Sequence, residues 1–231
     1  SNVGHPISGL WVHSNVLLED IPLSSLKRRL SGLELLHYPI YQRLFGERVL
    51  SARERLQVSS ITVVFTDITG STRMYEEIGD PMAYNLVRDH FEIIQRVFES
   101  IGGRLVKTIG DAVMATFPTP DRALAAALRM RQAMRALNDA HGREDLLLKI
   151  GIHEGPCLAV TFNERQDYFG QTVNIASRVQ GLAVSQSILA TASVVDHPQS
   201  TDLLERYGQK PMGQSQALRG MASEVAVYEI S

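Results

Sequence analysis

Two aspartates, Asp67 and Asp111, occupy positions from which they could bind divalent cations together. Asp67 ends an apolar run over 61–66, and Asp111 follows a tight turn at 109–110 between two short apolar segments. Hard cations such as Mg²⁺ bind one or two carboxylates together with phosphate oxygens, and a pair of ions stabilises the attacking and leaving oxygens of an in-line displacement. The backbone carbonyl of Ile68 could add an oxygen ligand. The alternative is that each aspartate only caps a turn or a helix, which is the commoner role for either one alone.

The segment after the first aspartate has the residue types of a loop that binds phosphate groups. Gly70 lets the backbone approach a ligand closely, and Ser71 and Thr72 place hydroxyl donors where a helix would begin. The N–H groups at a helix N-terminus attract anions. Serine and threonine are also ordinary helix caps, so this signal alone is weak. The sequence contains no Walker A motif, which excludes a P-loop site.

A polar pair, Asn174 and Arg178, is spaced four residues apart within a predicted helix over 170–182. Residues at that spacing share a helix face, and the apolar residues between them would pack inward. A guanidinium and an amide that face one point suit the negative charge that develops on a transferring phosphorus centre. Such a pair in isolation more often forms local surface hydrogen bonds, so its interpretation depends on the neighbouring motifs.

A sheet and several helices must bring these segments together, and the hydrophobic pattern predicts both. The predicted strands cover 61–66, 104–107, 112–117, 146–153, 157–162, 187–191 and 225–230, with a Gly-Pro pair at 155–156 between the fourth and the fifth. The predicted helices cover 81–100, 121–137 and 170–182. The order β-α-β-β-α-β, followed by further elements, predicts an α+β ferredoxin-like sandwich with a mainly antiparallel sheet and helices on one face. The strands that carry the two aspartates are adjacent in such a sheet, so the carboxylates can converge.

Composition limits the classes of protein that this chain could be. Of its 231 residues, 44% are hydrophobic and 21% are charged, which is typical of a globular protein with a sizeable core. The net charge of -2 gives no reason to expect a nucleic-acid partner. No apolar run reaches the roughly 18–20 residues needed to cross a bilayer, and no signal peptide is visible, so we expect no membrane segment. The single cysteine, Cys157, excludes an intramolecular disulfide and fits a cytoplasmic location.

Taken together and in this order, the motifs around Asp67, Asp111 and Asn174 resemble the catalytic domain of class III nucleotidyl cyclases, most of all bacterial adenylate cyclases. The similarity runs from about Ile61 to Ile230. It implies a catalytic domain over 59–231, preceded at 1–58 by an N-terminal extension that is either a regulatory or signalling region or a solvated connector. One departure is Ser71, where many members of the family have phenylalanine.

The resemblance also implies a role for each matching residue. The residues implied to bind two Mg²⁺ or Mn²⁺ ions are Asp67, Ile68 and Asp111. Those implied to bind the triphosphate are Gly70, Ser71, Thr72 and Arg219. Those implied to stabilise the transition state are Asn174 and Arg178. The residues implied to select the base are Lys107 and Asp167. An ammonium donor and a carboxylate acceptor can address the ring nitrogen and the exocyclic amine of adenine, whereas guanine presents the reverse pattern. Lys107 could instead be an ordinary surface residue at a strand end.

The function that the resemblance implies is that of an adenylate cyclase, which converts ATP into 3′,5′-cyclic AMP and pyrophosphate in signal transduction. Class III sites lie between two catalytic domains, one of which supplies the metal ligands and the other the remaining site residues. Because this chain carries both sets, the resemblance implies a homodimer with two equivalent sites. Two alternatives stay open: a catalytically silent module that binds nucleotide or regulates a partner, and a guanylate cyclase, which Lys107 and Asp167 disfavour.

Overall fold

The computed structural model describes residues 55–144, 146–162, 165–216, 218 and 224–231, all of which fall in the compact unit Gly32–Ser231. Most of the expected extension over 1–58 therefore lies outside the described residues, and so does Arg219. The boundary expected at 59 stays a prediction, and the first described strand begins at Arg55. Among the described residues, no helix is long and apolar enough to cross a membrane.

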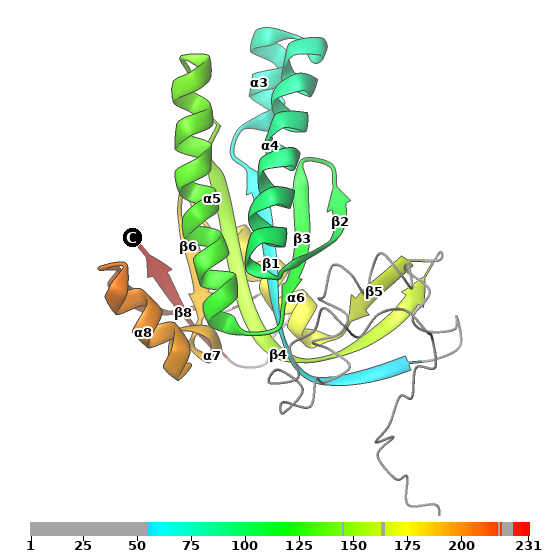
Figure 1. Cartoon of the computed structure of the whole chain (residues 1–231), viewed down its shortest axis with the longest axis vertical. Helices are drawn as coiled ribbons and strands as arrows, with labels where there is room; N and C mark the ends of the chain where they lie inside the picture. The colour runs from blue at the N-terminus through cyan, green and yellow to red at the C-terminus, as the bar shows by residue number, and fades with distance from the viewer. Residues whose placement is uncertain (1–54, 145, 163–164, 217, 219–223) are drawn as a thin grey trace, which may run out of the picture. The chain divides into compact units, whose positions relative to one another are not determined.

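An eight-stranded sheet forms the centre of the described structure (Figure 1). Its strands are β1 (Arg55–Ile68), β2 (Arg104–Ile109), β3 (Ala112–Phe117), β4 (Leu148–Phe162), β5 (Arg165–Phe169), β6 (Ile188–Thr191), β7 (Pro211–Gln216) and β8 (Val225–Ile230). Their order is β2-β3-β1-β4-β6-β8-β7, and β5 pairs with β4 off this path. Of the described pairings, β4 with β6 is parallel and the others are antiparallel, which confirms the predicted α+β fold with a mainly antiparallel sheet.

The two longest helices, α4 and α5, stand over the same face of this sheet (Figure 1). The described helices are α3 (Ser71–Ile78), α4 (Asp80–Ile101), α5 (Pro120–His141), α6 (Gln171–Leu182), α7 (Ala192–Val195) and α8 (Pro198–Arg206). A proline lies in the first turn of both long helices, and each ends at a left-handed glycine, Gly102 with φ 76° and Gly142 with φ 59°. These residues explain where both helices begin and end, and the helices predicted over 81–100 and 121–137 are present, the second extending four residues further.

Side-chain alternation along β1 divides the core between the two faces of the sheet. Val64 packs into the cluster that contains the buried residues of α3, α4, α5, α7 and α8. Val63 and Phe65 point the other way, into a cluster that contains Ala176 of α6. The prediction of helices on one face therefore describes the helices around α4 and α5, whereas α6 covers the opposite face.

A glycine in β4 allows α6 to lie close to that opposite face. Gly151 pairs with Phe65 of β1. A Cβ added at Gly151 would lie 2.2 Å from the backbone nitrogen of Gln180 and 2.4 Å from its Cα. Because these are backbone atoms of the helix, no side-chain rotation could make room, so the short distance between β4 and α6 requires glycine here.

The structure also corrects one prediction, because β4 is a single strand and not two strands interrupted by a Gly-Pro pair. Gly155 pairs with Ile61 and Cys157 pairs with Val58, so β1 has one extra residue opposite Pro156. This is a β-bulge, and bulges are among the few places where a sheet accommodates proline, which has no N–H for the ladder. The bulge in β1 thus lets β4 continue past its proline.

Candidate active site

The two aspartates expected to bind cations lie beside each other at one end of the sheet. Asp67 is the penultimate residue of β1, and Asp111 stands in the turn that leads into β3, the strand that pairs with β1. Burial raises the pKa of Asp67, and the negative charge of Asp111 raises it further. Other groups lower the pKa of Asp67. One is the positive charge of Lys149, which is paired with Asp67 across β1 and β4, and another is a hydrogen bond from the side chain of Gln180. The geometry therefore concentrates negative charge at this point and only partly compensates it.

This pair of carboxylates fits a hard divalent cation. Oδ2 of Asp111 is buried and has no hydrogen-bond partner in the described structure. A cation would satisfy that oxygen and remove the repulsion between the two aspartates. Among the described residues, no group of three or more histidine, cysteine or acidic side chains surrounds a common point. The remaining ligands would therefore be the backbone oxygen of Ile68, water or the phosphates of a substrate, a combination that is usual for Mg²⁺.

A buried imidazole lies next to this end of the sheet. His90 of α4 has no exposed surface. Burial lowers its pKa to about 4, and the nearby carboxyl and backbone of Asp111 oppose that shift. Neither ring nitrogen has a partner with full hydrogen-bond geometry among the described residues. The hydrophobic pattern that predicts this helix does not show which element His90 faces, so its position beside a site aspartate became visible only in the structure.

The two residues implied to select the base form an ion pair. Nζ of Lys107 lies 2.6 Å from Oδ2 of Asp167, and the side chains are 39% and 14% exposed, respectively. The other carboxylate oxygen of Asp167 accepts a hydrogen bond of 2.8 Å from the backbone N–H of Tyr168, which fixes its orientation. The ring of Phe169 lies with its centroid 5.9 Å from the ammonium of Lys107. Lysine carries three N–H donors, so this one can bind Asp167 and a ligand at once.

Buried polar contacts hold the strand that carries Asp167. Gln166 accepts a hydrogen bond of 2.7 Å from Nη1 of Arg104 in β2, and its own amide nitrogen donates to the hydroxyl of Tyr168 at 3.1 Å. Burial raises the pKa of Tyr168 to about 12, so this hydroxyl stays protonated at neutral pH. These bonds connect β5 with β2, the two strands that supply the ion pair. Sequence reasoning missed this supporting network, because Arg104 lies 62 residues before Gln166 in the chain.

The helix with the polar pair presents both residues away from the core. Ile175, Ala176 and Val179 of α6 are buried against the sheet, as their spacing predicted. Asn174 is exposed and Arg178 is half-buried. In the described part of the chain, neither side chain forms a hydrogen bond with the ion pair or the aspartates, so such bonds do not join all the predicted site residues.

The expected phosphate loop lies where β1 leads into α3. Gly70 has φ 71°, a left-handed conformation that favours glycine, and α3 begins at Ser71. Gly70 at the N-cap has no side chain that could cap this helix, and Thr72 is exposed. The N–H groups at the start of this helix lie where an anion would be attracted. The other residue expected to bind the triphosphate, Arg219, lies outside the described residues, so its role stays a prediction.

Comparison with known proteins identifies the family. The family model of the adenylate and guanylate cyclase catalytic domain matches residues 54–221, so the chain belongs to this family of class III cyclases, as its motifs indicated. An adenylate cyclase of Anabaena cylindrica is 31% identical over 185 residues, which cover 74% of this chain and 36% of that protein. The crystal structure of the adenylyl cyclase CyaB from P. aeruginosa superposes with a TM-score of 0.67 at 25% identity, over 77% of this chain and 96% of that one.

Guanylate cyclases are also among the relatives. The receptor-type guanylate cyclase Gyc76C of Drosophila melanogaster is 32% identical over 139 residues, which cover 55% of this chain and 9% of that protein. The chain thus spans about a third of the Anabaena protein and less of the Drosophila one. Overall similarity therefore defines a nucleotidyl cyclase domain, and the choice between ATP and GTP depends on the residues of the site.

Proposed function

We propose that this domain is an adenylate cyclase, acting in the cytoplasm, that converts ATP into 3′,5′-cyclic AMP and pyrophosphate. The observation that carries the choice of base is the ion pair of Lys107 with Asp167, 2.6 Å apart. It offers an ammonium donor and a carboxylate acceptor next to each other, which suits the ring nitrogen and exocyclic amine of adenine. A site built from such groups discriminates strongly, because the wrong base leaves them unpaired.

The chemistry follows from the other groups of the site. Asp67 and Asp111, with the carbonyl of Ile68, would hold Mg²⁺ or Mn²⁺, two ions per site, which supply charge neutralisation at the attacking and leaving oxygens. The oxygen of the 3′-hydroxyl forms a bond to the α-phosphorus and gives up its proton to solvent. The bond from that phosphorus to the oxygen bridging to the β-phosphate breaks, and pyrophosphate leaves. The N-terminus of α3, with Gly70, binds phosphate oxygens during this step.

The transition state would be stabilised by Asn174 and Arg178, whose amide and guanidinium donate hydrogen bonds to the oxygens that gain charge. We further propose that these residues act on a nucleotide bound to the aspartates of a second copy of the chain. An exposed apolar pair supports this dimer: Leu158 and Phe169 face each other across β4 and β5 and are 40% and 48% exposed. Phe169 also lies near Lys107, so an interface over this pair would adjoin the base-selecting residues.

The first test is the production of cyclic nucleotide from ATP and from GTP, with Mg²⁺ and with Mn²⁺, over a range of protein concentrations. We expect cyclic AMP from ATP, with a specific activity that rises with protein concentration as dimers form. A folded protein that binds ATP but yields no product would instead be a silent nucleotide-binding module. Preferential formation of cyclic GMP would reject the base assignment.

Two substitutions separate the roles within the site. Asp111→Asn should abolish turnover and leave the fold intact, whereas Asp139→Asn, which removes the same charge from the exposed end of α5, should leave turnover unchanged. Lys107→Glu should lower kcat/KM with ATP by about 10- to 100-fold, the value of a hydrogen bond to a charged group. Normal activity of Asp111→Asn would reject the metal assignment, and an unchanged preference for ATP in Lys107→Glu would reject the role of the ion pair.

A further inference from the structure

A hollow lined with arginines lies on α5 and shares no residue with the candidate active site. The residues that line this arginine hollow are Leu128, Arg129, Arg131, Gln132, Arg135, Tyr207 and Gln209. Its volume is about 360 Å³, which is within the range of sites for small ligands. One wall comes from α5, and the other comes from the segment between α8 and β7.

The central arginine of this hollow is held in place. Nη1 of Arg131 donates a hydrogen bond of 2.9 Å to the backbone oxygen of Ile230, and Nη2 donates one of 2.8 Å to Oε1 of Gln209. Burial lowers the pKa of Arg131, and the positive charge of Arg135 lowers it further. Because a guanidinium has five N–H donors, the fixed group keeps others for a ligand.

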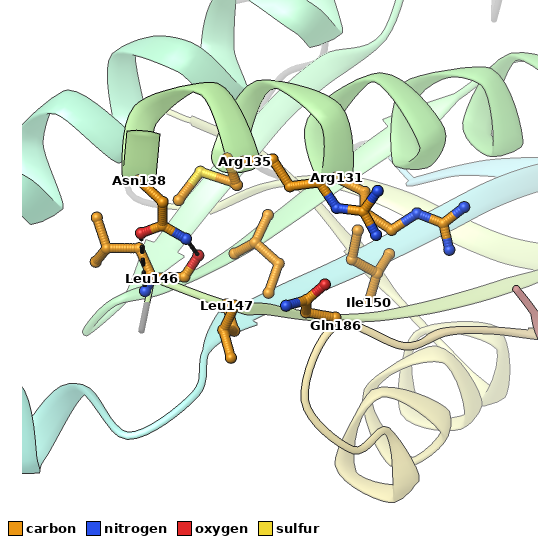
Figure 2. Close-up of a pocket in the computed structure, with 9 residues that line it drawn as sticks. Arg131, Arg135, Asn138, Leu146, Leu147, Ile150 and Gln186 are labelled. Carbon is orange, nitrogen blue, oxygen red and sulfur yellow. Dashed lines mark hydrogen bonds between the residues drawn. The ribbon is translucent and has the colours of Figure 1, made fainter. Parts of the chain in front are cut away.

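The second arginine lies beside the first. Figure 2 shows the guanidinium groups of Arg131 and Arg135 next to each other, near Gln186. Their spacing of four residues places them on one face of α5, where like charges repel. In the described part of the chain, no carboxylate forms an ion pair with Arg129, Arg131 or Arg135. A bound anion would therefore relieve a repulsion that no ion pair with a described carboxylate compensates.

The space beneath these arginines cannot be the ligand site. That slot, between α5 and β4, has a volume of about 10 Å³, which admits no more than about one water molecule. Its one buried amide, on Asn138, is already bonded to both backbone groups of Leu146, at 3.1 Å and 3.2 Å. A ligand must therefore bind in the outer, arginine-lined hollow.

We propose that the arginine hollow binds a small anion with phosphate groups, such as a diphosphate or a phosphate monoester. Planar guanidinium groups bind phosphate oxygens through paired hydrogen bonds, and two of them side by side match two such groups. Tyr207 and Gln132, which also line the hollow, carry neutral O–H and N–H donors. The concave shape favours a small ligand over an acidic protein segment. This inference is independent of the proposed cyclase activity.

The test is a calorimetric titration of the full chain with inorganic pyrophosphate and with inorganic phosphate, at low ionic strength. EDTA keeps divalent cations away from Asp67 and Asp111, so the active site does not contribute through bound metal. We expect saturable binding of pyrophosphate that Arg129→Gln/Arg135→Gln weakens at least about 10-fold. These two side chains make no hydrogen bond or ion pair in the described structure, so their replacement should preserve the fold.

The matched control is Arg88→Gln/Arg96→Gln, which removes the same charge from exposed positions of α4 and should leave binding unchanged. Equal weakening in both double variants would mean nonspecific attraction and would overturn the proposal. Absence of pyrophosphate binding to the unaltered chain would overturn it too, as would binding of a polyglutamate peptide in place of pyrophosphate. Arg135→Lys should weaken binding several-fold, because lysine keeps the charge and loses the paired hydrogen bonds; unchanged affinity would overturn the assigned geometry.

Discussion

Replacing Gly151 by alanine should displace α6, the helix that carries Asn174 and Arg178. The added Cβ would lie 2.2 Å from the nitrogen of Gln180, whereas an ordinary contact distance is about 3.5 Å. The helix would therefore have to move by roughly 1 Å, because the contact is with its backbone and β4 is held between β1 and β6. Overpacking of this kind costs about 1–3 kcal/mol. In a domain of this size, a cost of about 2 kcal/mol lowers the Tm by about 4–8 °C.

A shift of α6 should also impair catalysis if the proposed function is correct, because a misplacement of about 1 Å can lower the rate about 100-fold. The matched control is Gly181→Ala, since a Cβ at Gly181 meets nothing within 4 Å. That substitution in a helix should stabilise the protein by up to about 1 kcal/mol. Thermal unfolding followed by circular dichroism, together with turnover of ATP, would be measured for both variants. A normal Tm and normal turnover in Gly151→Ala would refute the close packing of α6 on β4.

Three further predictions test the described core. Burial raises the pKa of Cys157 to about 11, so iodoacetamide at pH 8 should label it slowly in the native protein and rapidly in urea; rapid native labelling would contradict its burial. Burial lowers the pKa of His153 from 6.5 to about 4. Below pH 6.5 the unfolded chain therefore binds a proton that the folded chain does not, so the stability that the neutral, buried His153 allows above pH 6.5 is lost as the pH falls towards 4. His153→Gln should accordingly show a shallower loss of stability in urea unfolding between pH 7 and pH 4, and a slope equal to that of the unaltered chain would reject this assignment. Asn138→Ala leaves the backbone groups of Leu146 unpaired and should cost about 1–3 kcal/mol, seen as a lower urea midpoint; an unchanged midpoint would show that these bonds contribute nothing.

The local pattern of the sequence was enough to predict most of the fold. The apolar run before Asp67 and the helical spacing of apolar residues in the two long helices are local signals, and the strand and helices they predict are present. The neighbourhood of Asp67 and Asp111 was also predictable, because it follows from the adjacency of two strands in the expected sheet. Their action as metal ligands, and the roles of the other site residues, remain predictions.

Long-range packing was the part that the sequence could not supply. An amphipathic pattern predicts which side of α6 is apolar, but it does not indicate which face of the sheet that side covers. The decisive residue, Gly151, has no local signal that distinguishes it from a turn glycine. The arginine hollow has the same limitation, because its two walls lie more than seventy residues apart in the chain. The contact of Gln180 with Asp67 likewise exists only because α6 packs behind β4.

Because α6 covers the face of the sheet opposite α4 and α5, the proposed activity depends on what else covers this helix. The face under α4 and α5 is closed by the main core, whereas Asn174 on α6 stays exposed to water in a single chain. Hydrogen bonds from an amide to a phosphate stabilise a transition state far more in a site that excludes water than in a solvated one. If the polar pair acts as proposed, a second surface should cover α6, and the exposed pair of Leu158 and Phe169 offers an apolar contact for that surface. On this reasoning, activity per molecule should depend on protein concentration, and a constant value down to high dilution would show that one chain completes the site alone.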